Sequence, residues 1–466
     1  MKDHIQSLIL TPSLFEFPFS DSSEKHHPLL NPSGTQAQES TTIVKGTGVW
    51  DHLRKVLLYL QPHRPQRNLP EDIYYYLKHF IGSLDHGTEL TIDSQFNHTL
   101  IPNFACSLAF LDPGWQAFGS TLRSLTLKGD VSLLVCVLEE SVQLVKLDSL
   151  SVDIGRNKYG VDVEAAFSAF VWFIARHSGT LSALEIVSGD VVDFNWFSRG
   201  LERLPRLRRL KVQQPPSKEQ SQCFAVQQFL LRHSDLITDL KWGYADAFLP
   251  HKDDGAQRTN DNTTIQTPFK ITFSNIQQFS VSGSCPGSVH LNQALSFVER
   301  HQNILTNISF ASWMLSLQDF ALLTQAAASP VMKELDVGVE LLTSRVFATL
   351  AAQFPSLEVL GLLYHKTGRM LAALSTRDST LPITIAENLD TIHFVHGFVE
   401  FEEDMEALSL GAWPVEALNI RRYACSERQK YRVESVGKVI VAGLPKIGFV
   451  NGMYKDQFIS NYHGMR

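Results

Sequence analysis

The sequence predicts an α/β fold in which short parallel strands alternate with helices along a curved, repetitive solenoid. Hydrophobic residues make up 44% of the 466 residues and charged residues 19%, which is typical of a globular protein. From about residue 120 a triplet of apolar residues recurs with a period of about 29 residues. Stretches with the apolar spacing of helices lie between successive triplets.

The first segment, residues 1–45, predicts a disordered arm. Four prolines stand among Ser, Thr, His and Gln, with no sustained apolar periodicity. Such a segment buries too little apolar surface to offset its conformational entropy.

The next segment, residues 46–118, predicts a small helical cap. Apolar residues spaced three and four apart from Val49 to Leu60 indicate an amphipathic helix that ends at Pro62. A second helix is expected to begin at Leu69-Pro70-Glu71-Asp72-Ile73, because proline fits the first helical turn and acidic residues favour the positive end of the helix dipole. The stretch from Glu89 to Asp93 is expected to be extended.

The third segment, residues 119–466, predicts the repetitive sheet. Each triplet has two variable residues after its first apolar residue and one after its second. Because strand residues alternate between faces, the last two apolar residues of a triplet point the same way, and stacking of neighbouring strands buries them. Residues 250–267, in the longest interval, predict a mobile surface insertion. The triplets are Leu122/Leu125/Leu127, Leu147/Leu150/Val152, Leu181/Leu184/Ile186, Leu207/Leu210/Val212, Ile237/Leu240/Trp242, Ile276/Phe279/Val281, Leu305/Ile308/Phe310, Met332/Leu335/Val337, Leu357/Leu360/Leu362, Leu389/Ile392/Phe394, Val415/Leu418/Ile420 and Leu444/Ile447/Phe449.

The segment from Leu122 to Phe449 resembles leucine-rich repeat proteins. Its irregular spacing looks like the divergent repeats of fungal F-box-type proteins, and it lacks the Asn or Cys that usually follows each triplet. The resemblance implies a curved parallel sheet with helices on its outer side. A non-repetitive α/β domain is the alternative, because any α/β chain contains some apolar triplets of this kind.

The helix opening Leu69-Pro70-Glu71-Asp72-Ile73, followed by Leu77, is similar to the start of an F-box. The resemblance implies docking of a Skp-type adaptor of cullin ubiquitin ligases through Leu69, Pro70, Ile73 and Leu77. The second half of the F-box pattern is missing, so the F-box is degenerate or absent. The alternative is an ordinary helix that caps the apolar end of the solenoid.

The concave face of the sheet is the expected binding surface for a protein partner, because strand residues between the buried ones face solvent. Its mixture of basic, acidic and aromatic residues suits protein recognition. Polarity required only for solubility is the alternative. The candidate residues are Arg209, Lys211, Lys241, Tyr244, Glu334, Asp336, Tyr364, His393, His396, Arg421 and Arg422.

Catalysis, metal binding and cofactor binding are not expected. Gly283-Ser284-Cys285-Pro286-Gly287 looks like a nucleophile elbow, yet Pro286 has no N–H to donate to an oxyanion. A divergent α/β enzyme that uses Cys285 is the weaker alternative. The sequence contains no phosphate-binding P-loop and no histidine or cysteine spacing typical of a zinc site.

Charge and cysteine usage narrow the expected partners and compartment. The net charge of −7 gives no general attraction to nucleic acid or anionic membranes, and no apolar stretch is long enough to span a bilayer. Five isolated cysteines and no signal peptide indicate a reducing compartment, the cytoplasm or the nucleus. We therefore expect a non-catalytic protein-interaction module, in its narrower form a substrate receptor of a cullin-type ubiquitin ligase. A stand-alone scaffold or sensor is the alternative.

Overall fold

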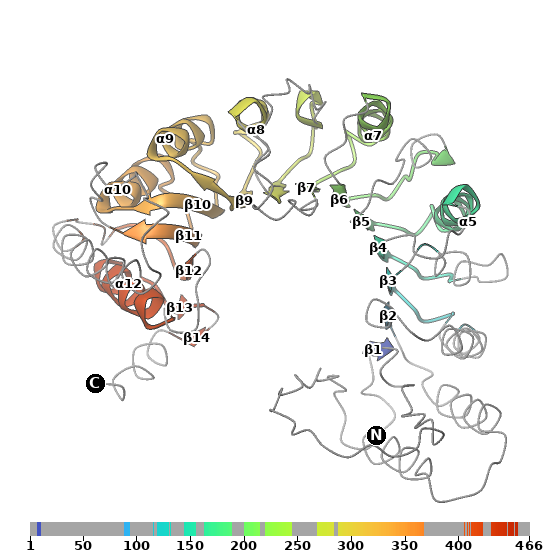
Figure 1. Ribbon diagram of the computed structural model, residues 1–466, viewed down its shortest axis with the longest axis horizontal. Coiled ribbons are helices and arrows are strands. Elements are labelled where there is room, and N and C mark those ends of the chain that lie inside the picture. The colour runs from blue at the N-terminus through green and yellow to red at the C-terminus, as the bar shows by residue number, and fades with distance from the viewer. Residues whose placement is uncertain are drawn as a thin grey trace, which may run out of the picture. The chain divides into compact units, whose positions relative to one another are not determined.

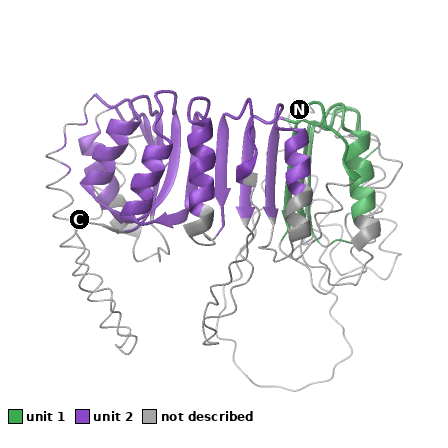
Figure 2. Ribbon diagram, turned by 90° about the horizontal axis from the view of Figure 1, so that it is seen from above, with its two compact units in different colours: residues 1–207 green, residues 208–466 purple. Residues whose placement is uncertain are grey.

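The computed structural model divides the chain into two compact units, Met1–Leu207 and Arg208–Arg466 (Figure 2). The structure describes residues 7–10, 88–93, 115, 119–129, 131, 144–154, 163–188, 200–214, 220–244, 268–283, 288–367, 405, 408, 410, 412–422, 430–444, 446–451 and 453–454.

The first unit contains a parallel sheet whose strands lie in chain order, with a helix between the last two of them. The alternation predicted from the triplets is confirmed in β3 and β4, where every second residue is buried. The elements are β1 (Ser7–Leu10), β2 (Glu89–Asp93), β3 (Ser124–Gly129), β4 (Ser149–Ile154), α5 (Val163–Arg176) and β5 (Ala183–Ser188).

Two strands of this sheet precede the predicted start of the repetitive part at residue 119. The extended stretch expected at Glu89–Asp93 is strand β2, and its Leu90 and Ile92 are buried. Ser7–Leu10 pairs in parallel with β2, so this part of the 1–45 segment is a strand and not a disordered arm. Its pairing partner lies about 80 residues further along the chain, and a contact of that range leaves no local periodicity in the sequence.

The second unit contains a longer sheet, again with its strands in chain order and parallel, except for a final antiparallel pair. Helices α8, α9, α10 and α12 lie on one side of its strands (Figure 1). The predicted α/β class with a parallel sheet is therefore confirmed. The elements are β6 (Arg209–Gln214), α7 (Gln220–Arg232), β7 (Asp239–Tyr244), the 3-10 helix η3 (Pro268–Lys270), β8 (Gln278–Ser282), α8 (Ser288–His301), β9 (Asn307–Leu315), α9 (Leu317–Ala326), β10 (Glu334–Leu342), α10 (Ser344–Gln353), β11 (Val359–Thr367), β12 (Ala417–Arg422), α12 (Lys430–Gly443), β13 (Phe449–Val450) and β14 (Met453–Tyr454).

The core of the second unit lies between the sheet and the helices. It includes an aromatic group in which the ring centroids of Phe279 and Phe297 are 4.4 Å apart and those of Phe279 and Phe310 are 6.0 Å apart. Trp313 is the largest fully buried side chain and packs edge-on against Phe310. Each such side chain contributes about 1.5–3 kcal/mol by leaving water.

Backbone hydrogen bonds tie each repeat to the next at the start of the strands. The carbonyl oxygen of Arg208 accepts from the N–H groups of Thr238 and Asp239, at 2.8 and 3.1 Å. The carbonyl of Thr238 then accepts from Gln277 and Gln278, and the same pattern continues at Gln277, Thr306, Lys333, Glu358 and Glu416. Because these bonds use only the main chain, the repeats are joined without the side-chain ladder that the sequence lacks.

Three buried histidines stand at the C-terminal ends of α5, α7 and α8. Each follows the pattern Phe-x-x-Arg-His, at Phe173 to His177, Phe229 to His233 and Phe297 to His301. In every case Nδ1 lies 2.7 or 2.8 Å from the phenylalanine carbonyl oxygen. The histidine and phenylalanine rings pack with centroids 4.2 to 4.4 Å apart.

Two of these histidines also bind the backbone of the preceding repeat. His177 Nε2 accepts the N–H of Leu144 at 3.1 Å, and His301 Nε2 accepts the N–H of Phe273 at 2.9 Å. A carbonyl can only accept and an amide N–H can only donate, so both rings are neutral with the proton on Nδ1. Burial lowers the pKa of both histidines below its ordinary value, and the nearby Arg176 and Arg300 add to that effect.

Two of the predicted triplets need correction. Leu389/Ile392/Phe394 lies outside the described residues, and no strand separates β11 from β12, because Val359 pairs directly with Ala417 and the register continues from there. In the last triplet, Val450 pairs with Leu418 and is buried, whereas Phe449 pairs with Ala417 and remains 43% exposed. The triplet was placed three residues too early, because Leu444, Ile447 and Val450 are all apolar at equal spacing.

The expected insertion at 250–267 lies outside the described residues, as does the cap over 46–87 and 94–114. Among the helices that the structure describes, none combines the length and apolar character required to cross a bilayer.

Candidate functional site

The sheet of the second unit has a face opposite its helices, here called the polar face. Among the described residues, no helix covers it (Figure 1). The parallel register aligns its side chains into rows that run across the strands. One row contains Arg209, Asp239, Gln278, Asn307, Glu334, Val359, Ala417 and Phe449, and the next contains Lys211, Lys241, Ser280, Ser309, Asp336, Gly361 and Asn419.

One end of the polar face, on β6 and β7, is basic. Arg209 and Lys241 are exposed and Lys211 is half-buried. Asp239 lies between them in the register but is only 9% exposed, and its Oδ1 has no hydrogen-bond partner among the described residues. Burial raises the pKa of Asp239, and the charges of Lys241 and Arg209 oppose that rise. The exposed charges at this end are therefore mainly the positive charges of Arg209 and Lys241.

The middle of the polar face, on β8 and β9, is polar and uncharged. It presents the side chains of Gln278, Ser280, Ser282, Asn307 and Ser309, all exposed or half-buried. The hydroxyls and amides supply hydrogen-bond donors and acceptors without long side chains.

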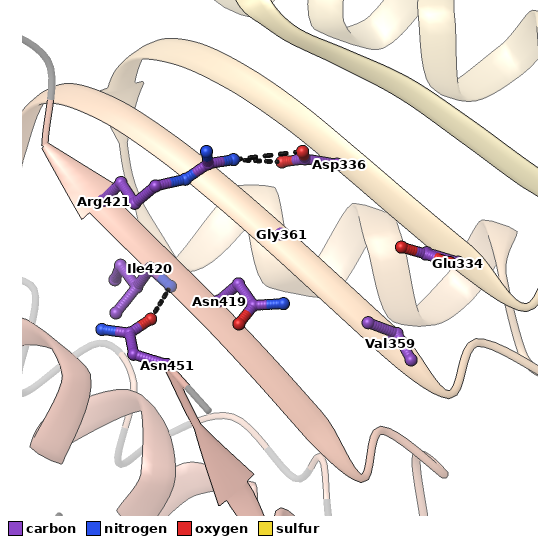
Figure 3. A pocket seen from close by; sticks show the side chains of 8 residues that line it. All are labelled: Glu334, Asp336, Val359, Gly361, Asn419, Ile420, Arg421 and Asn451. Atoms are coloured by element: carbon purple, nitrogen blue, oxygen red, sulfur yellow. Dashed lines mark hydrogen bonds and ion pairs between the residues drawn. The ribbon is translucent and has the colours of Figure 1, made fainter. Parts of the chain in front are cut away.

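The other end, on β10 to β13, contains a hollow of about 430 Å³ (Figure 3). Glu334 and Asp336 line one side of it, Asn419, Arg421 and Asn451 line the other, and Val359 and Gly361 lie between them on β11. Apart from Val359, Gly361 and Ile420, every lining residue is charged or carries an amide.

An ion pair that crosses β11 bounds the hollow. Nη2 of Arg421 lies 3.0 and 3.1 Å from the two carboxylate oxygens of Asp336. A Cβ atom at Gly361 would overlap the Asp336 carboxylate, so a larger residue at this position would force the Asp336 side chain to shift. The Arg421 side chain remains 55% exposed, so the pair itself contributes little to stability.

Hydrogen bonds to neighbouring strands position the other polar side chains of the hollow. Nδ2 of Asn307 donates to Glu334 Oε2 at 2.6 Å, and Ser309 Oγ donates to Asp336 Oδ2 at 3.4 Å. Asn451, in the left-handed conformation with φ of 50°, accepts the N–H of Ile420 at 2.8 Å. Asn419 also lines the hollow, and its side-chain amide has no hydrogen bond to another described residue.

Six of the predicted binding residues lie on the polar face. The structure gathers Arg209, Lys211 and Lys241 at its basic end, and Glu334, Asp336 and Arg421 around the hollow. The prediction for Tyr364 is wrong, because this side chain is completely buried. Strand β11 extends to Thr367, so its alternation continues past the triplet and places Tyr364 on the same face as Leu360 and Leu362.

Other predicted residues lie outside what the structure describes. These are Leu69, Pro70, Ile73, Leu77, Cys285, His393, His396 and the side chains of Tyr244 and Arg422.

Gly361, Asn451 and Phe449 also belong to this face and were not predicted from the sequence. Gly361 lies between the buried residues Leu360 and Leu362 of β11. Asn451 and Phe449 lie in the last repeat, whose register was predicted incorrectly. The three Phe-x-x-Arg-His segments were not predicted either, although they are detectable in the sequence as an internal repeat. No group of three His, Cys, Asp or Glu residues suited to a metal ion occurs among the described residues.

The first unit has a corresponding face with a different character. In the register of β3 to β5 it presents Ser124 beside Ser149, Thr126 beside Ser151, and Lys128 beside Asp153. These positions are half-buried and mostly carry small hydroxyls. Charged residues in the same rows are Glu89 on β2 and Glu185 on β5.

Comparison with known proteins assigns no family to the chain. No protein-family model matches the sequence, and no curated protein has detectable similarity to it.

Proposed function

We propose that the chain is a leucine-rich-repeat-like solenoid that binds a protein partner on the polar face of its second unit. The observation that carries this proposal is the aligned rows of charged and polar side chains on a sheet face that no described helix covers. The parallel register fixes the positions of the strands that carry these side chains, so the side chains are presented on a rigid surface.

The chemistry of the face favours a protein over the other classes of ligand. Small-molecule sites are mostly apolar and enclosed, whereas the hollow at β10 to β13 is lined mainly by charges and amides. Glu334 and Asp336 would repel the phosphates of a nucleic acid that lay along the face. A surface with both charge signs and exposed arginine is typical of protein interfaces.

The proposed role is non-catalytic. Among the described residues, the hollow is lined by no serine, cysteine, histidine or lysine, and its carboxylates at Glu334 and Asp336 are engaged by Asn307 and Arg421. The enzyme alternative depends on Cys285, where Pro286 removes the backbone donor that the reaction needs. A Cys285→Ser variant that abolished a hydrolase or transferase activity of the purified protein would revive that alternative.

The binding proposal is tested by capture of partners on immobilised full-length protein. Proteins retained by the parent should be lost from an Arg209→Glu, Lys241→Glu double variant. They should be retained by Glu299→Lys, because Glu299 is exposed on helix α8, on the other side of the sheet. Equal retention by all three proteins would contradict the proposal.

A narrower proposal is a substrate receptor of a cullin-type ubiquitin ligase. It is supported only by the F-box-like opening at Leu69 to Ile73. A purified Skp-type adaptor should bind the parent and not a Leu69→Asp, Ile73→Asp double variant. Absence of binding to both proteins would leave a stand-alone scaffold, with the binding face unaffected.

A further inference from the structure

We propose that the polar face selects an extended partner segment whose acidic and basic residues are separated by about four residues. The acidic side chains would lie over β6 and β7, and a lysine or arginine would enter the hollow at β10 to β12. This inference rests on the proposed function and names the chemistry of the partner. It follows from the separation of charge along one rigid sheet.

The basic end suits a carboxylate because its cations are exposed and its anion is not. Arg209 and Lys241 occupy adjacent strands and are both exposed, whereas Asp239 between them is 9% exposed. A partner carboxylate would therefore meet two cations before it approached Asp239. Arginine can bind a carboxylate through two parallel hydrogen bonds, which adds geometric selectivity.

The hollow suits a single cationic side chain. Its volume of about 430 Å³ lies toward the lower end of the range of about 300–1,000 Å³ for ligand sites. Glu334 uses only Oε2 for the bond to Asn307, and Oε1 has no hydrogen bond to any described residue. Asp336 and Asn419 offer further oxygen acceptors around the same space.

Arg421 does not cancel the preference of the hollow for a cation. Its Nη2 is engaged with Asp336, and its side chain is more than half exposed, so its charge is largely screened by solvent. With Glu334 and Asp336 opposite one arginine, the hollow carries a net charge of −1 from its lining residues. Arg421 can still donate to a carbonyl oxygen of the bound segment.

The distance between the two ends fixes the spacing of charges in the partner. The centre of the hollow lies over β11, which is four strand intervals from β7 in the sheet, or about 19 Å. An extended chain advances about 3.3–3.6 Å per residue, so five to six steps, with about four residues between the charged ones, span the gap. The intervening side chains Gln278, Ser280 and Ser309 are uncharged and can bind the backbone of such a segment.

The experiment uses the full-length protein and fluorescein-labelled peptides in a polarisation titration. The probe is acetyl-Glu-Asp-Ser-Gly-Ser-Gly-Arg-Lys-amide. Control peptides have the same composition with alternating charges, or carry acidic pairs or basic pairs at both ends. We expect the probe to bind at least about tenfold more tightly than every control, with an affinity that falls as salt is added.

Charge-reversal variants show which end of the polar face determines the preference among the peptides. Arg209→Glu, Lys241→Glu should move the preference from the probe to the peptide with basic pairs at both ends. Glu334→Lys, Asp336→Lys should move it to the peptide with acidic pairs. Glu299→Lys on α8 should change neither, and circular dichroism should show that all variants are folded.

Three results would overturn the inference. They are equal affinity for the probe and its alternating-charge control, tighter binding of either uniformly charged peptide by the parent, and a preference that survives both double variants. If protein capture still depends on Arg209 and Lys241 while the peptides are not distinguished, the proposed function stands and the spacing inference alone fails.

Discussion

Acidification should loosen the link between helix α8 and the segment that precedes β8. His301 is held neutral there, with Nδ1–H donated to Phe297 and Nε2 accepting from Phe273. Protonation of Nε2 would place a donor against the donor N–H of Phe273. Arg300, a charged group at the same junction, donates to the carbonyls of Phe269 and Ile271 and opposes a second positive charge.

The sign and size of the effect follow from the lowered pKa of His301. The unfolded chain takes up a proton near pH 6.5, whereas the folded chain resists it to a lower pH. The contribution of His301 to stability is therefore complete above pH 6.5 and is lost as the pH falls toward the folded pKa. The loss is at most about 1.4 kcal/mol per pH unit, a factor of ten in the opening equilibrium.

Hydrogen exchange of the Phe273 amide measures this opening directly. We expect its protection factor, corrected for the intrinsic pH dependence of exchange, to fall by up to about tenfold between pH 6.5 and 5.5. In His301→Gln the protection should be lower at pH 7.5, because a buried hydrogen bond worth about 1–3 kcal/mol is disturbed, and it should then be independent of pH. An unchanged protection factor in the parent, or the same fall in the variant, would refute the reasoning.

Other substitutions test the remaining features. Gly361→Ala should lower the free energy of unfolding by about 1–3 kcal/mol in urea titrations, because the new methyl group overlaps Asp336. Gly179→Ala, with open space around its Cα, should have little effect. Equal effects of the two substitutions would contradict the placement of the Asp336 carboxylate over Gly361. Arg421→Met should change the free energy of unfolding by less than about 1 kcal/mol, since the ion pair is exposed, and a much larger loss would show that the pair is structural. Asp239→Asn should stabilise the second unit at pH 7, because burial disfavours ionisation of this carboxyl, and the gain should shrink as the pH falls through the carboxyl range. A lower stability of Asp239→Asn at pH 7 would show that attraction to Arg209 and Lys241 outweighs burial.

The repeats were predictable where their signal is local. Alternation within one strand fixed the positions of β3 to β12, because each strand carries its own buried pair such as Leu210 and Val212. The register error at Phe449 arose where three apolar residues follow at equal spacing and several phases fit equally well. Strand β1 was missed because its partner β2 is distant in the sequence.

The site was less predictable than the fold. The sequence identified Glu334, Asp336 and Arg421 as surface residues, yet their grouping around one hollow depends on a contact between residues 85 positions apart. Gly361 on the intervening strand leaves the space that the Asp336 carboxylate occupies in that contact. Tyr364 was misassigned because the triplet marks the start of a strand and not its length.

Binding of a protein on the polar face is the central claim, and site-specific photo-crosslinking in cell extract tests it most directly. A photoreactive amino acid at Ser280, in the middle of the polar face, should form an adduct with a partner protein, and the adduct should disappear in the Arg209→Glu, Lys241→Glu background. The same group at Glu299 on α8 should not form it. Adducts at Glu299 equal to those at Ser280, or adducts at Ser280 that persist in the charge-reversed background, would contradict the account.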